Sequence, residues 1–463
     1  MDKDELYKNI TKLIDKKYVS IDEAVLYCYA CDVSNIEHPP DIVVRPNSVD
    51  EIVKIVKFAF DNKIPVTPRG GGTGAAGGAV PIKGGILLDL TRMNRIINIM
   101  IKDLQVTVEP GLVHSELNKI LEEYGFRFPV KPGSSEMCTI GGMIANNASG
   151  MNAVKYGSTG DYILKLEVVL PDGSVTTFGS HSIKDVSGYD LIRVFVGSEG
   201  TLGIITKATL KIMPIPDVIG VLVAVFSDLK DAGNTVISTF QSRVIPSAIE
   251  ILDKSSIIAI NKYSPELHLP LAEAILLFEF DGYLDCIKKE IEIIENVCKL
   301  NNAIKIDKTL DNEKRTQLWA ARSLVGAASN MVREGYSRVY IGEDIAVPLS
   351  KIPDVLLKLR ELSVKYDFPI ITFGHISVGN LHPAITIRKY EPDDWNKVMK
   401  LNDEIHKLAI EFQGTLTAEH GIGLARAKYL KLYTPATLEV MKYIKNSFDP
   451  KNIMNPGKMG LEE

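Results

Sequence analysis

The chain has 463 residues, of which 45% are hydrophobic and 24% charged, and its formal net charge is −5. This composition is typical of a globular protein of two or three domains, and it excludes a chain built around a basic nucleic-acid surface. The first residues are charged, and no apolar stretch approaches the roughly 18–20 residues that a membrane helix requires. We therefore expect a cytoplasmic protein that meets a membrane only through a partner.

A strand–helix–strand unit is predicted near the start of the chain. Residues 1–35 have apolar side chains at helical spacing, and a proline pair separates them from a short apolar strand at 42–44. Asn47 or Ser48 is placed to cap a helix with an acidic first turn, and a second strand at 64–68 follows. This order predicts a βαβ unit that leads directly into a cluster of glycines.

The rest of the chain changes character near Pro216. Up to that residue glycines are dense and the expected strands are short, whereas longer strands and amphipathic helices follow. We predict an N-terminal helical segment at 1–37, a first domain at 38–216 and a second domain at 217–463. The further expected strands are 85–90, 105–108, 164–170, 201–210, 221–226 and 274–280, and the expected helices are 287–300 and 352–366.

The five cysteines do not predict a disulfide framework, because their number is odd and the chain is long. Cys28 and Cys31 form a C-x-x-C motif, which in some proteins is a redox pair or half of a metal site. No second C-x-x-C is present to complete a zinc or iron–sulfur site. We interpret the pair as two small side chains on one helical turn.

A glycine-rich loop follows the second predicted strand. Gly72, Gly74 and Gly77 satisfy G-x-G-x-x-G, the pattern of a Rossmann dinucleotide site. That site requires a helix directly after the loop, and the proline- and glycine-containing segment 79–85 does not favour one. Asp89 in the next strand keeps the Rossmann alternative open. A Walker loop is excluded, because its closing Gly-Lys-Ser/Thr is absent.

We predict instead that this loop is a coil whose backbone N–H groups face a phosphate. Six of the nine positions from Gly70 to Gly78 are glycine, which permits positive φ and a close approach of the backbone. The stretches 131–135 and 139–150 are also small, amide-rich and hydroxyl-bearing. Two such loops in one domain indicate a large nucleotide bound along its length.

Two glycine-bounded segments in the second half hold residues that suit a metal. His375, His382 and Glu419 supply the imidazole and carboxylate ligands that a borderline divalent metal prefers, and three ligands leave a position open for substrate. His420 then remains to move a proton. The other histidines are interpreted as structural: His38, His114, His181, His268 and His406.

Three stretches of the first domain, 69–78, 139–150 and 197–206, resemble the signature segments of the vanillyl-alcohol-oxidase/p-cresol-methylhydroxylase type of FAD-binding domain. The two histidine-containing segments of the second half resemble the FAD-linked 2-hydroxy-acid dehydrogenase branch. That branch includes the glycolate oxidase large subunit, D-lactate dehydrogenase and D-2-hydroxyglutarate dehydrogenase. The resemblance covers about residues 38 to 460. It implies an α+β, two-domain flavoprotein in which an N-terminal FAD-binding domain precedes a C-terminal α+β substrate (cap) domain that faces the flavin.

The resemblance also implies which residues contact the FAD. The first glycine loop would surround the pyrophosphate, the second would lie along the ribityl chain and ring, and Asn455 would close over the flavin from the C-terminal side. Thr73 stands where relatives with covalent FAD often have a histidine, so the FAD is expected to be non-covalent. The expected contacts are Pro68, Arg69, Gly70, Gly71, Gly72, Thr73, Gly74, Pro132, Gly133, Thr139, Gly142, Ala145, Asn146, Glu199, Gly203, Ile205 and Asn455.

In the second domain the resemblance assigns roles to the metal candidates. His375, His382 and Glu419 resemble the family's ligands for Zn²⁺ or Mn²⁺, which would hold the hydroxyl and carboxylate oxygens of the substrate. His420 would accept the hydroxyl proton as hydride passes to the flavin, and Arg322 would hold the substrate carboxylate.

Two departures from the family bear on this site. Ser377-Val378 replaces the usual Gly-Asp between the two histidines, a change that affects metal affinity, ligand orientation or substrate choice. Gly326 and Ala327 occupy a turn where the family's further substrate contacts vary, so a second substrate carboxylate has no evident anchor. This absence favours lactate or glycolate over 2-hydroxyglutarate.

The expected function is FAD-dependent oxidation of a small D-2-hydroxy acid, D-lactate or glycolate, to the 2-oxo acid. Electrons are expected to pass to a non-NAD acceptor: a quinone, an electron-transfer protein or an iron–sulfur subunit. A homodimer is expected. Two alternatives stay open, a D-2-hydroxyglutarate dehydrogenase and a non-redox alkyl transferase of the ether-lipid synthase branch. A flavin-free zinc hydrolase leaves the two glycine-rich loops unexplained.

Overall fold

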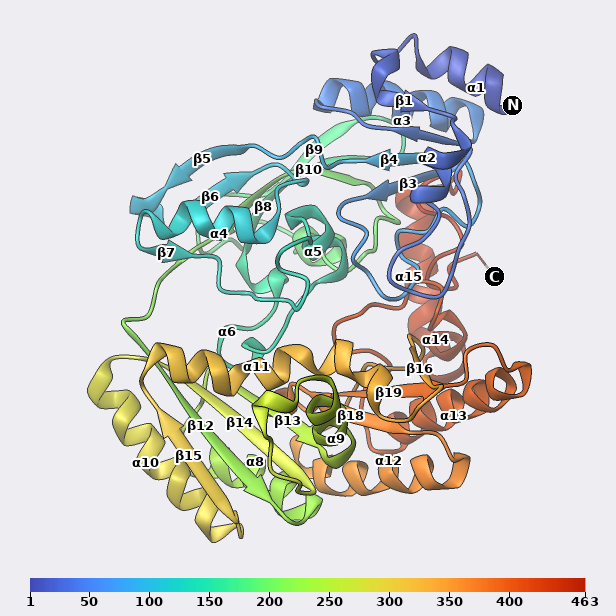
Figure 1. The fold of residues 1–463 in the computed structure, drawn as a ribbon. Coiled ribbons are helices and arrows are strands. Elements are labelled where there is room, and N and C mark those ends of the chain that lie inside the picture. The colour runs from blue at the N-terminus through green and yellow to red at the C-terminus, as the bar shows by residue number, and fades with distance from the viewer. Residues whose placement is uncertain (463) are drawn as a thin grey trace. The chain divides into compact units, whose positions relative to one another are not determined.

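The computed structural model describes residues 1–462 and divides into two compact units. Unit 1 comprises residues 1–149 and 158–215 together with the chain from Glu419 onward, and unit 2 comprises residues 150–157 and 216–418. Each unit is built of helices packed on sheets, as Figure 1 shows. The predicted α+β, two-domain fold class is confirmed.

The first sheet of unit 1 has four strands in the order β1-β2-β4-β3. Strands β2, β4 and β3 pair in parallel, as a βαβ start requires, and the apolar face of α3 packs on them. Ser48 caps α3, because its hydroxyl accepts a hydrogen bond of 3.2 Å from the backbone N–H of Glu51. The elements are α1 (Lys3–Ile10), β1 (Val19–Ser20), α2 (Glu23–Cys28), β2 (Ile42–Val44), α3 (Val49–Asn62), β3 (Val66–Arg69) and β4 (Ile86–Asp89).

No helix follows β3 in the described chain, where residues 70–85 form only turns and coil. The Rossmann alternative is therefore wrong, since that site needs a helix N-terminus directly behind its glycines. The local sequence explains the outcome. Pro81 has no N–H to donate, and Gly84 and Gly85 have φ values of 64° and 73°, in the left-handed region that ends helices.

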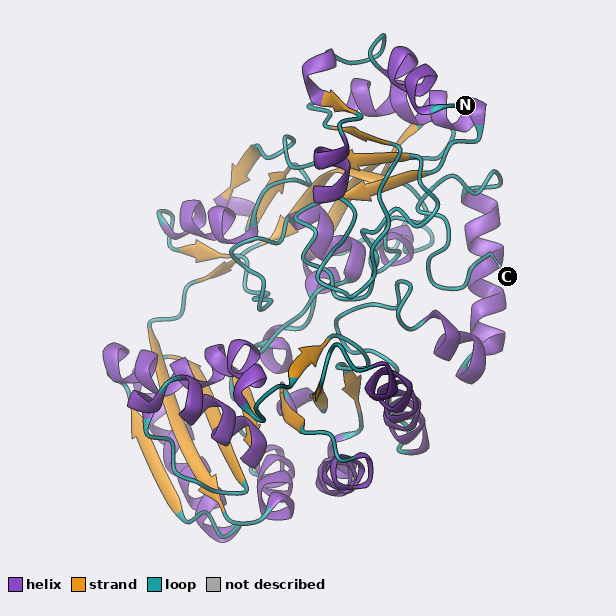
Figure 2. Ribbon diagram, turned by 45° about the vertical axis from the view of Figure 1, so that its right-hand side comes forward, coloured by secondary structure: helices purple, strands orange, loops and turns teal. Residues whose placement is uncertain are grey.

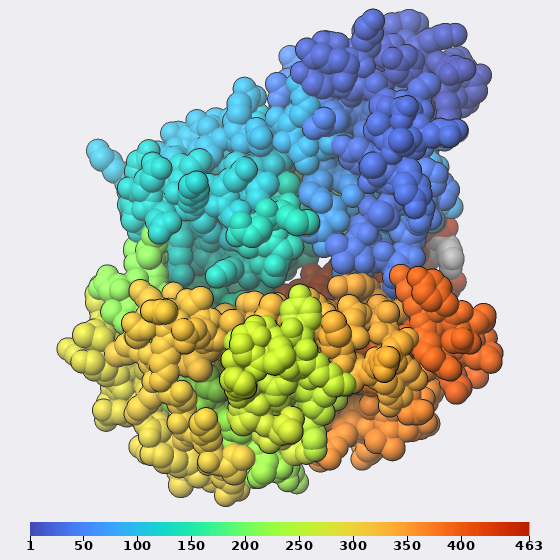
Figure 3. Space-filling view, in the orientation of Figure 1, coloured from blue at the N-terminus to red at the C-terminus, as the bar shows by residue number. Residues whose placement is uncertain are grey.

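The second sheet of unit 1 has five antiparallel strands in the order β5-β6-β10-β8-β9. Helices α4, α5 and α7 contribute to its core, where the ring of Phe195 meets the ring of Phe448 edge-on at 5.3 Å. In the space-filling view, the chain around α1, in the darkest blue, lies on the surface of unit 1 (Figure 3). The elements are β5 (Ile96–Met100), β6 (Gln105–Val108), α4 (His114–Glu122), β7 (Phe126–Arg127), α5 (Ile140–Asn146), β8 (Ile163–Val169), β9 (Val175–Gly179), α7 (Leu191–Phe195), β10 (Ile204–Lys211), β11 (Met213–Pro214), α14 (Ala427–Tyr433) and α15 (Pro435–Phe448).

Unit 2 is built on one sheet in the order β15-β12-β14-β13-β18-β19-β16, with β17 paired to β19. All the pairings are antiparallel, and helices cover both faces (Figure 2). Along β14, Leu276 and Phe278 enter one core while Ile275 and Leu277 enter the other, which explains why its sequence is apolar without alternation. The elements are α6 (Ala153–Tyr156), β12 (Val218–Phe226), α8 (Leu229–Gln241), β13 (Ala248–Asp253), α9 (Lys254–Tyr263), β14 (Ala274–Gly282), α10 (Leu284–Leu300), β15 (Lys305–Thr309), α11 (Asn312–Ala328), β16 (Ser337–Val339), β17 (Ile345–Ala346), α12 (Ile352–Tyr366), β18 (Ile370–Gly374), β19 (Asn380–Ile387) and α13 (Pro392–Glu411).

Residues 150–157 interrupt unit 1 and attach to the sheet of unit 2. The ammonium group of Lys155 donates to the buried carboxylate of Asp281 at 2.6 Å, and the hydroxyl of Tyr156 donates to the second oxygen of that carboxylate at 2.6 Å. Asn152 donates to the backbone oxygen of Ser247 at 3.1 Å. This short segment therefore ties the chain that leaves α5 to the end of β14.

Helix α13 is the longest described, with 20 residues. It buries one stripe, which includes Val398, Leu401 and Ile405, and leaves its charged face exposed. Among the described residues, no helix is long and apolar enough to cross a membrane.

The imidazole of His114 predicts a pH dependence of stability. This ring is buried at the start of α4, where its two nitrogens lie 2.7 Å from Ser135 Oγ and 3.1 Å from Asn118 Nδ2. Burial lowers the pKa of His114 from 6.5 to about 4. Between these two pH values the unfolded chain therefore binds a proton on this imidazole and the folded chain does not. The free energy of unfolding should fall by roughly 3 kcal/mol as the pH decreases from about 6.5 to about 4.

Urea unfolding of the wild type and of His114→Asn, measured across this pH range, checks the expectation. The difference in unfolding free energy between the two proteins should shrink as the pH falls. A difference that stays constant with pH would show that the burial of this imidazole does not produce the effect.

Candidate functional site

A cavity in unit 1 collects most of the residues that the sequence assigned to FAD. The loop after β3 forms one wall, α5 forms a second, and the turn before β10 forms a third. His420 joins them from the returning chain, whereas Pro132, Gly133 and Asn455 do not line the cavity. The expected residues that do line it are Pro68, Arg69, Gly70, Gly71, Gly72, Thr73, Gly74, Thr139, Gly142, Ala145, Asn146, Glu199, Gly203 and Ile205.

The glycines of the first loop are required by close contacts. A Cβ on Gly70 would lie 2.1 Å from Thr139 Oγ1, and a Cβ on Gly71 would lie 2.2 Å from the backbone oxygen of Met137. The loop therefore packs directly against the segment that leads into α5. Side chains at these two positions would push apart the walls that the sequence predicted to hold the nucleotide.

Arg69 is held by the C-x-x-C region rather than by an acid. Its guanidinium lies over the ring of Tyr29 at 5.6 Å, and Nη1 donates to the backbone oxygen of Cys31 at 2.8 Å. Cys28 and Cys31 are exposed free thiols. Cys28 is the last residue of α2 and Cys31 lies beyond it, so the two cysteines do not share a helical turn as predicted, and only Cys31 contacts the arginine, through its backbone oxygen.

Asn455 supports the cavity wall without lining it. Its side-chain amide donates to the backbone oxygens of Gly78 at 2.9 Å and Glu199 at 2.7 Å, and both of those residues line the cavity. The wall itself fits the phosphates of an FAD, because four of its residues are the glycines 70, 71, 72 and 74, which have no side chain between the backbone N–H groups and an anion.

The carboxylate of Glu199 fixes the segment that carries His420. It accepts hydrogen bonds from the backbone N–H groups of Ile422 at 2.7 Å and Gly423 at 2.8 Å. Burial raises the pKa of Glu199, and these two donors oppose that rise. The sequence assigned Glu199 to the cofactor. That assignment concerns backbone contacts, and the side chain holds the turn after His420 at the cavity wall.

His375 and His382 form a buried pair in unit 2. His375 directly follows β18, His382 lies in β19, and their rings meet at 5.2 Å and 89°. Nδ1 of His375 lies 2.6 Å from Oε1 of Glu250, and Nδ1 of His382 lies 3.0 Å from the backbone oxygen of Glu343. A carboxylate and a carbonyl accept only, so each Nδ1 carries the proton and Nε2 is the nitrogen able to ligate a metal.

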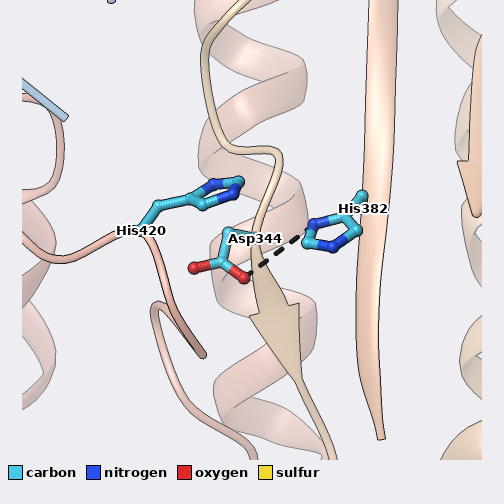
Figure 4. A group of neighbouring side chains, drawn as sticks. All are labelled: Asp344, His382 and His420. Atoms are coloured by element: carbon cyan, nitrogen blue, oxygen red, sulfur yellow. Dashed lines mark ion pairs between the residues drawn. The ribbon is translucent and has the colours of Figure 1, made fainter. Parts of the chain in front are cut away.

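The buried carboxylate of Asp344 contacts β19 and the last residues of unit 2 before Glu419. This carboxylate lies beside the ring of His382, with Oδ1 at 4.0 Å from Nδ1 (Figure 4). It also accepts hydrogen bonds from Asn380 Nδ2 and from the backbone N–H of Ala418, both at 2.9 Å. Glu419 is the next residue after Ala418 and begins the returning part of unit 1. In unit 1, Ser149 Oγ donates to Oε2 of Glu419 at 3.4 Å.

The residues that depart from the family pattern lie in the turn between the two histidines. Ser377 is buried, and its hydroxyl has no hydrogen-bond partner among the described residues. Val378 is 39% exposed. Neither residue supplies a carboxylate, so the two rings are oriented by Glu250 and by the backbone of Glu343 instead.

Arg322 is joined to His375 through the carboxylate of Glu250. Its Nε donates to the carboxylate of Glu250, and its guanidinium lies over the ring of Phe373 at 5.0 Å. Glu250 is fully buried on β13. Burial by itself raises the pKa of Glu250, but the charge of Arg322 and the hydrogen bonds from His375 and Arg322 outweigh burial and lower it to about 2.

A second arginine, Arg338, lies over the same Phe373 ring at 5.5 Å. Its Nε donates to Glu343 Oε1 at 3.0 Å, and Nη2 donates to Oε2, which makes a bidentate pair. A Cβ on Gly326 would lie 3.3 Å from Nη1 of Arg338, so this glycine makes room for the guanidinium. A second cation, which the sequence did not identify, therefore lies over the same ring as Arg322 and comes from β16.

Sequence reasoning missed Glu250, Glu343 and Arg338. The available signal was an acid inside an apolar strand, since Glu250 stands between Ile249 and Ile251. A buried acid in such a strand needs a cationic partner. The partner is 72 residues away in the sequence, so the pattern alone did not identify it.

The packing of the glycine loop predicts the effect of a single methyl group. Gly71→Ala should yield protein that retains little FAD, because the new Cβ must displace the backbone at Met137. The ratio of absorbance at about 450 nm to that at about 280 nm measures the flavin content. Ser182→Ala, on the exposed loop after β9, is the control, because it lies outside the expected FAD contacts. Equal FAD content in the two variants would contradict the packing argument.

The comparisons with known proteins agree with this geometry. Residues 40–179 match the model of an FAD binding domain, and residues 215–459 match the model of the C-terminal domain of FAD linked oxidases. The chain is 38% identical to glycolate oxidase subunit GlcD of Bacillus subtilis, covering 91% of this chain and 89% of that protein. It is 35% identical to the probable mitochondrial D-lactate dehydrogenase of Danio rerio, covering 91% and 84%. The fold is similar to that of p-cresol methylhydroxylase, with a TM-score of 0.80, 18% identity and coverage of 99% and 96%. The chain belongs to the FAD-linked oxidase family and is an FAD-dependent oxidoreductase.

Proposed function

We propose that this protein oxidises a small D-2-hydroxy acid, D-lactate or glycolate, to the corresponding 2-oxo acid. The observation that carries the proposal is the cluster in unit 2, where two imidazoles with protonated Nδ1 atoms lie beside the buried guanidinium of Arg322. A hydroxy acid presents a hydroxyl and a carboxylate that suit these groups. The names of the relatives, glycolate oxidase and D-lactate dehydrogenase, support the same substrate class.

His375, His382 and Glu419 are proposed to hold a divalent metal, Zn²⁺ or Mn²⁺. Two Nε2 atoms and one carboxylate fit such an ion by donor type. Glu419 is one peptide bond from Ala418, whose N–H is bound to Asp344 in the histidine cluster. When bound, the metal would supply a Lewis acid that lowers the pKa of the substrate hydroxyl.

Arg322 is proposed to orient the substrate by its carboxylate. Its pair with Glu250 uses Nε, so the terminal nitrogens are not used by that pair. A planar guanidinium fixed at one edge is suited to bidentate carboxylate binding at the other. Burial beside Phe373 keeps water from competing for the same nitrogens.

His420 is proposed to accept the proton of the substrate hydroxyl. It lines the flavin cavity, and its Nε2 lies 3.6 Å from Oε1 of Glu419. Glu199 holds the following turn, so the imidazole is carried by a fixed backbone. When bound, the FAD would supply the two-electron acceptor for the hydride of the substrate carbon.

We propose a preference for substrates with a single carboxylate, because Arg338 is already paired with an acid. Its bidentate pair with Glu343 occupies Nε and Nη2, and Gly326 faces Nη1. A second substrate carboxylate would have to compete with Glu343 for this cation. Lactate and glycolate avoid that competition, whereas 2-hydroxyglutarate does not.

The electron acceptor is proposed to be a quinone, an electron-transfer protein or an iron–sulfur subunit. The five cysteines are free thiols, two of them buried in separate cores. They are not grouped as iron–sulfur ligands would be. Electrons would therefore leave the flavin for a partner molecule.

The proposal predicts which compounds reduce the flavin. Under anaerobic conditions, D-lactate or glycolate should bleach the absorbance at about 450 nm, because hydride transfer reduces the flavin and no second acceptor is present to reoxidise it. L-Lactate and D-2-hydroxyglutarate are the comparison compounds. No bleaching by any 2-hydroxy acid would refute the proposal and would favour the alkyl transferase alternative.

The metal assignment predicts a selective loss. His382→Ala should remove bound metal and lower turnover by at least about 100-fold, while the FAD content stays that of the wild type, because His382 belongs to unit 2 and the cavity to unit 1. Elemental analysis and a dye-coupled assay measure the two quantities. His181→Ala, on an exposed loop, serves as the control. If His382→Ala turns over at the wild-type rate, His382 is not a ligand.

A further inference from the structure

Glu250 is placed opposite His375 by the sheet itself. Strands β13 and β18 pair in antiparallel register, with Ile251 opposite Gly374 and Leu252 opposite Phe373. Continued by one residue, the same register places Glu250 opposite His375. The carboxylate is fully buried, and Oε1 lies 2.6 Å from Nδ1 of that histidine.

The second oxygen of this carboxylate has a different partner. Oε2 accepts a hydrogen bond from Nε of Arg322, whose side chain is 11% exposed. One carboxylate thus joins two groups that come from different elements, the residue after β18 and helix α11. A planar carboxylate with both oxygens engaged fixes the separation and the relative orientation of its two donors.

Glu343 offers a comparison within the same cluster. Its carboxylate binds Arg338, but its contact with His382 is made by the backbone oxygen. Replacing the Glu343 side chain therefore leaves the His382 hydrogen bond in place. Replacing the Glu250 side chain removes the hydrogen bonds of both His375 and Arg322.

We propose that Glu250 is a positioning residue that couples the proposed metal ligand His375 to the proposed substrate clamp Arg322. The inference rests on the proposed function. The carboxylate accepts a hydrogen bond from the Nδ1–H of His375, which holds the proton on Nδ1 and leaves the Nε2 lone pair directed toward a metal. The same group balances the charge of the buried guanidinium and turns its terminal nitrogens toward an incoming substrate carboxylate.

Glu250→Gln is the variant that tests the coupling. The amide keeps the shape of the side chain, but its single carbonyl oxygen serves only one of the two donors. Zn²⁺ titration of the chelator-treated flavoprotein should show affinity about 10–100-fold below that of the wild type. In the same variant KM for D-lactate should rise by about tenfold or more, with FAD content unchanged.

Glu343→Gln is the matched control, and its Zn²⁺ affinity should stay that of the wild type. The proposal is overturned if Glu250→Gln binds Zn²⁺ and D-lactate as the wild type does, or if Glu343→Gln loses Zn²⁺ affinity to the same extent. If Glu250→Gln fails to fold, the double variant Glu250→Gln/Arg322→Gln removes the unbalanced buried charge. That double variant should still bind Zn²⁺ more weakly, because the neutral amide oxygen that then accepts from His375 Nδ1 raises the basicity of the ring less than a carboxylate does.

A third measurement separates this inference from the proposed function. Nitrogen-15 spectra of labelled histidines report which ring nitrogen is protonated without any metal or substrate. His375, assigned by its absence in His375→Asn, should be protonated at Nδ1 in the wild type and should show a mixture of tautomers in Glu250→Gln. If the wild type neither binds Zn²⁺ nor oxidises a hydroxy acid, the proposed function fails. An unchanged His375 tautomer in Glu250→Gln overturns the positioning role in either case.

Discussion

The buried carboxylate of Glu199 is the interaction on which the architecture of unit 1 depends. It joins the turn before β10 to the returning chain, more than 220 residues later. A buried charge is costly, and here two backbone N–H groups offset that cost. Both glycines of the returning Glu-His-Gly-Ile-Gly segment serve this contact. A Cβ on Gly421 would lie 2.8 Å from Oε1 of Glu199, and a Cβ on Gly423 would lie 2.1 Å from the backbone oxygen of Ala76.

The cluster in unit 2 uses the same physical device. Glu250, Glu343 and Asp344 are buried acids, and each is satisfied by a group that has a proposed chemical role or that supports one. In both units residues of the candidate sites are therefore held by buried acids, and hydrogen bonds to the carboxylates offset the cost of burying their charge.

Sequence reasoning succeeded where the signal is local. Strand β2 and helix α3 follow from apolar spacing and from the cap at Ser48, and the glycine loop follows from its composition. It failed where the signal is a pairing between distant residues. The contact between Glu250 and Arg322 depends on how a strand and a helix pack, and no spacing rule encodes that. Asn455 illustrates an intermediate case. The sequence predicts that Asn455 contacts the flavin, but its side chain contacts the backbones of Gly78 and Glu199 and does not line the cavity.

The structure gives less reason than the sequence to expect that Ser377-Val378, in place of the family's Gly-Asp, changes the orientation of the two histidine rings. An acid between two metal-ligating histidines would matter most if it oriented one of the rings. Here His375 is oriented by Glu250 from β13, and His382 is oriented by the backbone oxygen of Glu343. Neither hydrogen bond passes through the turn that contains Ser377. The hydrogen bonds that orient the two rings are therefore independent of this turn, in which the buried Ser377 stands in the place of the glycine and the partly exposed Val378 in the place of the acid.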